Sequence, residues 1–168
     1  MIGFVRVGER NYEVVQAELH VPLLDETRHI FLCVNIQPPG GFAFWYVQLP
    51  GLGRLEELSG QRIHVRCDGF SYQDDTLATD CTGAESWTDL NYWQIDGRAY
   101  SWGEMRIDFQ RVDGGRYRIL VTARLSENDL RNVDWENASL LQHCPVEASA
   151  ELSIVADERN PLEAEAEQ

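Results

Sequence analysis

The sequence predicts an all-β fold: a single-domain antiparallel β-sandwich of the jelly-roll or Greek-key kind, with a closed β-barrel as the alternative. Apolar and polar residues alternate in several segments, and turn residues separate these segments at the spacing typical of sandwiches and barrels. Aromatic residues make up 10% of the 168-residue chain, and aromatic and β-branched side chains favour strands. Only one or two short helical turns are expected.

The first part of the chain alternates expected strands with turns rich in glycine and proline. Two of these strands are apolar on both faces, which is typical of strands in the middle of a layered fold rather than on a solvated sheet. The leucines of one helical turn share a face and are expected to close one end of the fold. The expected strands cover residues 2–7, 12–21, 29–36, 42–47 and 61–67, and the helical turn covers residues 54–58.

The second part of the chain is less uniform. Residues 68–96 are expected to form a long loop or a pair of ribbons, with one strand near residues 90–95. A serine in the position of a helix N-cap predicts a short helix or turn over residues 126–131. Regular alternation over residues 146–154 predicts the last strand, so residues 1–156 form the domain and residues 157–168 a mobile acidic tail.

A β-hairpin is predicted between residues 100–112 and 116–125, and its side-chain pattern fixes the register. A two-residue loop would set the apolar face of one arm against the arginine face of the other. A three-residue loop over residues 113–115 instead pairs Phe109 with Ile119 and Ile107 with Val121, as expected for a type I turn followed by a glycine bulge. The polar faces then complement each other, with Glu104 opposite Arg124 and Gln110 opposite Arg118.

The charge of the chain limits its partners. All fourteen basic side chains are arginines, no lysine is present, and the net charge is −14. Such a charge disfavours nucleic acid and anionic membranes. The missing lysine fits either a GC-rich genome or adaptation to high salt. No transmembrane run or secretory signal is found, so a cytoplasmic location is expected.

One candidate site lies in the acidic, aromatic segment. Carboxylates can accept hydrogen bonds from sugar hydroxyls or bind hard cations, and exposed aromatic rings can stack on sugars. The alternative is that the rings belong to the core and the acidic residues keep a long connection solvated. The candidate ligand-binding residues are Asp74, Asp75, Trp87, Asp89, Tyr92 and Trp93.

A second candidate site is the hairpin, which is the basic part of an acidic chain. Residues 98–131 contain seven arginines against five acidic residues. Arginine is enriched at interface hot spots, so one hypothesis is that this face binds an acidic partner. The alternative is pairing with carboxylates on neighbouring strands. The candidate interface residues are Arg106, Arg116, Arg118 and Arg124.

The sequence therefore favours a non-enzymatic protein that acts by binding, with another protein as the first expected partner. A carbohydrate or small-ligand module is the second hypothesis, and a carboxylate- or metal-dependent hydrolase the third. No cofactor or metal is expected, because the chain lacks a phosphate-binding glycine loop and its histidines and cysteines lack the spacing of a metal site. The sequence does not fix the oligomeric state.

Overall fold

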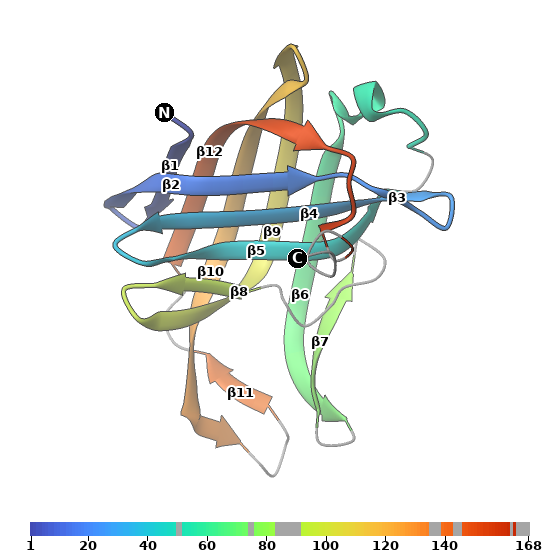
Figure 1. The fold of residues 1–168 in the computed structure, drawn as a ribbon. Helices are drawn as coiled ribbons and strands as arrows, with labels where there is room; N and C mark the ends of the chain where they lie inside the picture. The colour runs from blue at the N-terminus through green and yellow to red at the C-terminus, as the bar shows by residue number, and fades with distance from the viewer. Residues whose placement is uncertain are drawn as a thin grey trace.

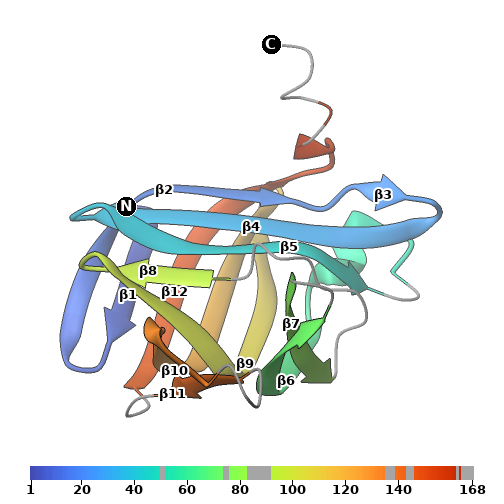
Figure 2. The ribbon, with the colours of Figure 1, turned by 90° about the horizontal axis from the view of Figure 1, so that it is seen from below.

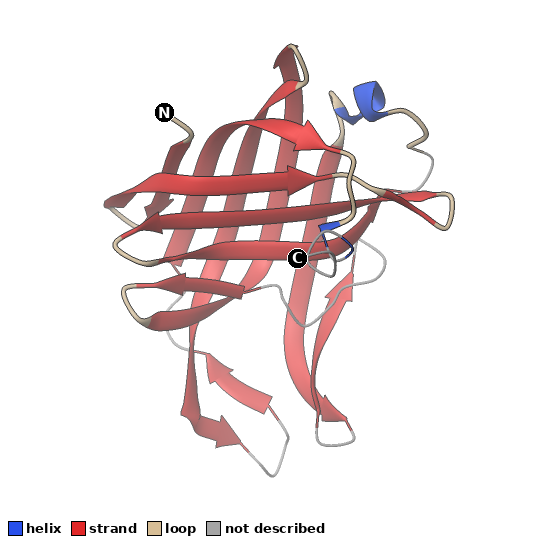
Figure 3. Cartoon of the chain, viewed as in Figure 1, coloured by secondary structure: helices blue, strands red, loops and turns tan. Residues whose placement is uncertain are grey.

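The computed structural model describes residues 1–49, 52–73, 76–82, 92–134, 139–142, 146–161 and 163. It is an all-β fold, as predicted. The described strands form one curled, largely antiparallel sheet with the outline of a half-barrel (Figure 1). Figure 3 shows how little helix accompanies these strands. Within the described ranges, no helix is long and apolar enough to cross a membrane.

The sheet joins the two ends of the chain. Its strand order is β11-β10-β12-β1-β2-β4-β5-β8-β9-β6-β7, β3 pairs with β4, and β9 also pairs with β10. The elements are β1 (Gly3–Val7), β2 (Arg10–His20), β3 (Leu23–Leu24), β4 (Thr27–Gln37), β5 (Gly40–Leu49), the 3₁₀ turn η1 (Leu55–Leu58), β6 (Arg62–Gln73), β7 (Thr76–Thr82), β8 (Tyr92–Ile95), β9 (Arg98–Asp113), β10 (Arg116–Asp134), β11 (Ser139–Gln142) and β12 (Val146–Asp157).

The core lies between two layers of the curled sheet. Strands β2, β4 and β5 run across strands β12, β10 and β9, and the view from below shows the space that side chains fill between them (Figures 1 and 2). Strand β12 shows the predicted alternation, since its inward side chains are buried and its outward ones are not. Its buried residues are Ala148, Ala150, Leu152 and Ile154.

The hairpin formed by β9 and β10 has the predicted register. Phe109 pairs with Ile119, and Ile107 pairs with Val121, so four buried side chains face the core from adjacent strands. The predicted polar pairs are confirmed as well, with Glu104 opposite Arg124 and Gln110 opposite Arg118.

The turn of this hairpin differs from the prediction. Asp113 pairs with Arg116, so the loop contains only two residues, Gly114 and Gly115, with φ of 49° and 78°. A type I turn would need a negative φ at both central positions, so this turn is of the primed kind that glycine favours. The ladder then skips Val112, and this bulge restores the register that a three-residue loop would have given.

The prediction of a helix or turn over residues 126–131 was wrong, because β10 continues as a strand through this segment. Ser126 pairs with Ser101 and Glu127 pairs with Tyr100 of β9. Pairing with β9 gives the backbone N–H and C=O groups hydrogen-bond partners that a helix would otherwise have supplied. The strand partner therefore outweighs the local preference of Ser126 for a helix N-cap.

The helical turn η1 forms where it was predicted and packs on the core through one of its leucines. Leu58 is fully buried, and the Tyr117 hydroxyl donates a hydrogen bond to the carbonyl oxygen of Leu55 at 3.0 Å. The Glu57 carboxylate accepts hydrogen bonds from the backbone N–H groups of Gly53 and Arg54, at 3.1 and 3.4 Å. Within residues 68–96, the paired strands β6 and β7 form a ribbon and β8 forms a strand. Of the two predictions for this segment, a long loop or a pair of ribbons, the ribbon is therefore present in the described residues.

The first residues of the predicted acidic tail contact the domain. Val21 donates a backbone hydrogen bond to the carbonyl oxygen of Asp157 at 2.7 Å. The guanidinium of Arg28, a nearly buried side chain, lies 3.0 Å from the Glu158 carboxylate. Strand β12 and the residues after it are therefore attached to the end of β2 and the start of β4.

Candidate functional site

The outer face of the sheet is organised in rows that run across β1, β12 and β10. Residues that pair directly in an antiparallel ladder point to the same face. Phe4 pairs with Glu151, and Glu151 pairs with Leu120, so the two apolar side chains flank one carboxylate. Two residues further along the strands, Arg6 pairs with Ser149 and Ser149 pairs with Thr122.

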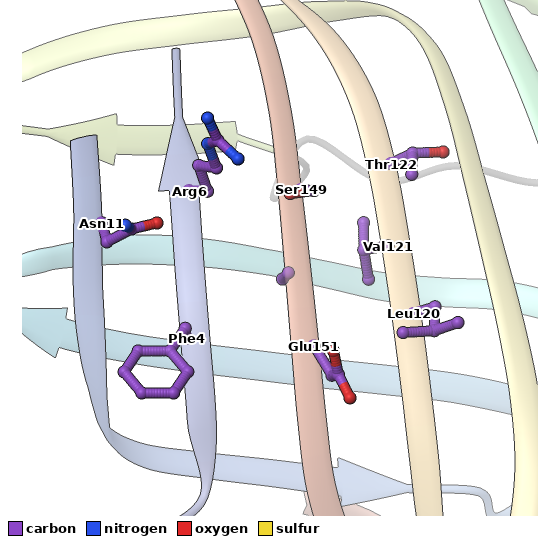
Figure 4. A pocket seen from close by; sticks show the side chains of 9 residues that line it. Phe4, Arg6, Asn11, Leu120, Val121, Thr122, Ser149 and Glu151 are labelled. Carbon is purple, nitrogen blue, oxygen red and sulfur yellow. The ribbon is translucent and has the colours of Figure 1, made fainter. Parts of the chain in front are cut away.

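These two rows frame an open groove with a volume of about 440 Å³ (Figure 4). Phe4 is 49% exposed and Leu120 is 37% exposed, although both have large apolar side chains. The groove therefore has an apolar end and a polar end. It is lined by Phe4, Arg6, Asn11, Leu120, Val121, Thr122, Ser149, Ala150 and Glu151.

The position of the groove follows from the alternation in β1 and from one glycine. Val5 and Val7 are buried, so Phe4 and Arg6 must face outward. Gly3 has φ of 155°, and a Cβ at this position would lie 1.9 Å from the carbonyl oxygen of Glu151. Only glycine fits there, and it allows β1 to lie against β12 at the apolar end of the groove.

All four arginines predicted as an interface lie on β9 and β10, on this outer face. Three of them contact carboxylates of their own or a neighbouring strand: Arg118 with Glu151 at 2.7 Å, Arg106 with Glu104 at 3.2 Å and Arg124 with Glu147 at 3.9 Å. The fourth, Arg116, donates to the backbone and hydroxyl oxygens of Ser153 at 3.3 and 3.4 Å. Local pairing, the alternative raised by the sequence, is therefore present in the structure.

Arg6 differs from these arginines. Its Nε donates to the carbonyl oxygen of Gly8 at 3.0 Å, and no carboxylate within the described ranges contacts it. It lies at the polar end of the groove, with Asn11 on the neighbouring strand (Figure 4). A guanidinium without a carboxylate partner keeps donors directed at solvent or at a ligand.

The residues of the predicted ligand site are only partly placed. Asp74, Asp75, Trp87 and Asp89 lie outside the described residues. Tyr92 and Trp93 are in β8, and Trp93 is fully buried. Its ring stacks on Phe42 with centroids 4.3 Å apart, so its faces are not open to a sugar. For Trp93, the structure agrees with the alternative reading of the segment as core.

One carboxylate of the acidic segment has a structural role. Asp96, in the turn between β8 and β9, accepts hydrogen bonds from the Tyr12 hydroxyl at 2.6 Å and from Arg10 at 3.0 Å. The Tyr12 hydrogen bond, followed by Arg10 and the more distant Arg98, lowers the pKa of Asp96 below its ordinary value. Burial is the main reason why the pKa of Tyr12 is raised. This contact joins two hairpins that are distant in sequence.

Cys33 is half-buried, and burial followed by the charge of Glu18 raises the pKa of its thiol, which disfavours the reactive thiolate. Among the residues that the structure describes, no group of three or more His, Cys, Asp or Glu side chains is placed to hold a metal ion. Neither observation indicates catalysis in the described part of the chain.

Phe4, Arg6 and Leu120 are the groove residues that sequence reasoning missed. The alternation in residues 2–7 contained the signal that Phe4 faces outward, because Val5 and Val7 occupy the other face. The pairing of β1 with β12 could not be read from that pattern. Comparisons of the chain with protein-family models, with curated proteins and with solved structures gave no match.

Proposed function

We propose that this protein acts by binding another protein through the outer face of β1, β12 and β10, without catalysing a reaction. The observation that carries the proposal is the placement of Phe4 and Leu120. Both side chains are substantially exposed, and they flank Glu151 on adjacent strands at the wall of one groove. Exposed apolar side chains that gather beside a depression are typical of interaction sites, whereas scattered ones are not.

The energetics favour contact at this groove. Complete burial of a Phe or Leu side chain contributes roughly 1.5–3 kcal/mol, and part of that remains to be gained at both positions. Strands carry these side chains, so little backbone conformational entropy is lost when a partner binds. Arg6 lines the groove and Arg118 contacts its one lining carboxylate, Glu151, and arginine is enriched among interface hot spots.

Several arginines on the outer face of the sheet are paired with carboxylates, although the chain as a whole is strongly acidic. Ion pairs on β6, β9, β10 and β12 match each of four arginines with one carboxylate, whereas the chain as a whole has a net charge of −14. A partner that approaches this face therefore meets arginines that are already paired. The matched pairs are Arg62 with Asp108, Arg106 with Glu104, Arg118 with Glu151 and Arg124 with Glu147.

The experiment compares groove variants with matched surface variants. Phe4→Ser and Leu120→Ser remove the apolar walls, while Val15→Ser and Val112→Ser remove somewhat more exposed apolar side chains that do not line the groove. Each full-length variant is used to capture partners from cells that express the chain naturally, with quantification by mass spectrometry. We expect at least one partner to be lost from both groove variants and retained by both controls.

The same partners on all four variants, or equal losses from all four, would contradict the proposal. Unfolding in urea, measured for each variant, separates loss of contact from loss of folding. The serine substitutions lie at exposed positions, so we expect their free energies of unfolding to stay within about 1 kcal/mol of the parent.

A further inference from the structure

The groove between Phe4 and Leu120 continues into a row of hydrogen-bond donors. Arg6, Asn11, Ser149 and Thr122 line this polar end. All four can donate hydrogen bonds, and none of them is acidic. The only carboxylate in the lining, Glu151, lies in the apolar row, where it contacts Arg118 at 2.7 Å.

The charge at the polar end is therefore positive and not yet matched. Arg6 contacts no carboxylate in the part of the chain that the structure describes. Arg118, Arg106 and Arg124 on the same face each have one. The chemical complement of this end is an anionic oxygen pair, such as a side-chain carboxylate that meets a guanidinium.

The spacing of the two ends matches an extended polypeptide. Phe4 and Arg6 are two residues apart on one strand, which separates them by about 7 Å along the groove. Phe4 and Leu120 lie on strands separated by β12, about 10 Å apart in the direction of the ladder, and the outward side chain of Glu151 stands between them. In an extended peptide, side chains two residues apart point the same way with the same 7 Å repeat.

From this geometry we infer that the partner inserts an extended segment with an apolar side chain followed, two residues along in either direction, by Asp or Glu. The apolar side chain packs against Phe4 and Leu120 above Glu151, and the carboxylate binds the guanidinium of Arg6. Asn11, Ser149 and Thr122 supply further hydrogen bonds at that end. This inference rests on the proposed function, because it assumes that the groove is where a protein partner binds.

The negative net charge of the chain affects how closely an acidic segment must approach before it is attracted to Arg6. A net charge of −14 repels an acidic segment at a distance. At physiological ionic strength, screening limits that repulsion to about 8 Å, and the contact with Arg6 acts within that distance. A second copy of this chain is a less suitable occupant, since it carries the same net charge of −14.

The test is a selection of random peptides displayed on phage, with the full-length chain as bait. We expect enriched peptides to carry an apolar residue and an acidic residue at positions i and i±2. Synthetic copies of the enriched peptides should bind Arg6→Gln roughly tenfold to a hundredfold more weakly than the parent. Arg116→Gln is the matched control, because Arg116 also bonds only neutral oxygens in the described structure but lies outside the groove.

A charge exchange sharpens the test. Arg6→Glu should lose the acidic peptides and should bind the same peptides when Lys replaces their acidic residue. Enrichment of basic peptides, of peptides without the pattern, or of no peptides would overturn the inference. Binding that requires Phe4 and Leu120 but ignores Arg6→Gln would overturn the acidic partner and leave the proposed function standing. Binding that ignores Phe4 and Leu120 would overturn the proposed function as well.

Discussion

Arg118 on β10 holds the carboxylate of Glu151 on β12, with Nε 2.8 Å and Nη2 2.7 Å from the same oxygen. Glu151 lies between Phe4 and Leu120 in the cross-strand row. The ion pair therefore joins the arginine face of β10 to the row that contains Phe4 and Leu120. The arginine face of the hairpin and the apolar end of the groove thus form one surface.

This ion pair is expected to contribute little to stability. Arg118 and Glu151 are 46% and 57% exposed in their side chains, and water screens exposed pairs strongly. A double-mutant cycle with Arg118→Ala and Glu151→Ala, followed by urea unfolding, should give a coupling energy below about 1 kcal/mol. A coupling energy of several kcal/mol would show that the hairpin arginines are stabilising elements rather than a surface available for binding.

The buried arginine should behave differently. Arg28 donates to the carbonyl oxygen of Val21 at 3.0 Å, reaches that of Gly53 at 3.3 Å and contacts Glu158 at 3.0 Å, with its side chain only 10% exposed. Arg28→Met should lower the free energy of unfolding by about 2–4 kcal/mol, because these acceptors lose a buried donor. The exposed control Arg106→Met should cost under about 1 kcal/mol. If urea unfolding showed that Arg28→Met and Arg106→Met lower the free energy of unfolding equally, the structural role given to Arg28 would be wrong.

Gly41 is expected to tolerate no side chain. It has φ of 146°, and a Cβ would lie 1.8 Å from the carbonyl oxygen of Val34 on the paired strand. Gly41→Ala should therefore lower the free energy of unfolding by at least about 2 kcal/mol. Gly53→Ala is the control, since no atom lies within 4 Å of the added Cβ, and it should change stability by less than about 1 kcal/mol. Thermal and urea unfolding of both variants would reveal whether β4 and β5 approach this closely.

The contact between Tyr12 and Asp96 predicts an acid-sensitive term in stability. The folded-state pKa of Asp96 is lowered, so its contribution is present above the unfolded value near 3.8 and is lost as pH falls through the folded value. Tyr12→Phe removes the largest cause of that shift. Its unfolding free energy should fall less steeply than the parent's as pH is lowered past this range. Part of the slope should remain, because hydrogen bonds from Arg159 also lower the pKa of Asp157. Identical slopes in urea unfolding at successive pH values would contradict this role for Tyr12.

The hairpin shows how much of the fold the sequence could predict. Alternation and charge complementarity fixed the pairing of Phe109 with Ile119, because a shift by one residue would have exposed the apolar faces. The turn type was beyond this reasoning. A bulge at Val112 and a three-residue loop give the same register further along the ladder, and sequence pattern alone does not separate them.

The failures have a common physical cause. The helix expected after Ser126 was replaced by a strand because β9 supplies a partner for its backbone, and such a partner is invisible to local propensity. The groove was missed for the same reason. Its walls, Phe4 and Leu120, come together only because β1 and β10 both pair with β12. For Trp93 the sequence left a ligand site and the core both open, since an aromatic residue in a strand fits both roles, and the residue packs on Phe42 in the core.

Site-specific cross-linking tests the groove most directly. A photo-reactive amino acid replaces Leu120 in one full-length variant and Val112, at the bulge beside the hairpin turn, in another. After irradiation in cells that express the chain naturally, we predict that position 120 captures a protein partner and that position 112, which is more exposed, does not. Capture of the same partner from both positions with equal yield, or from position 112 alone, would contradict the claim that the face between Phe4 and Leu120 is the binding surface.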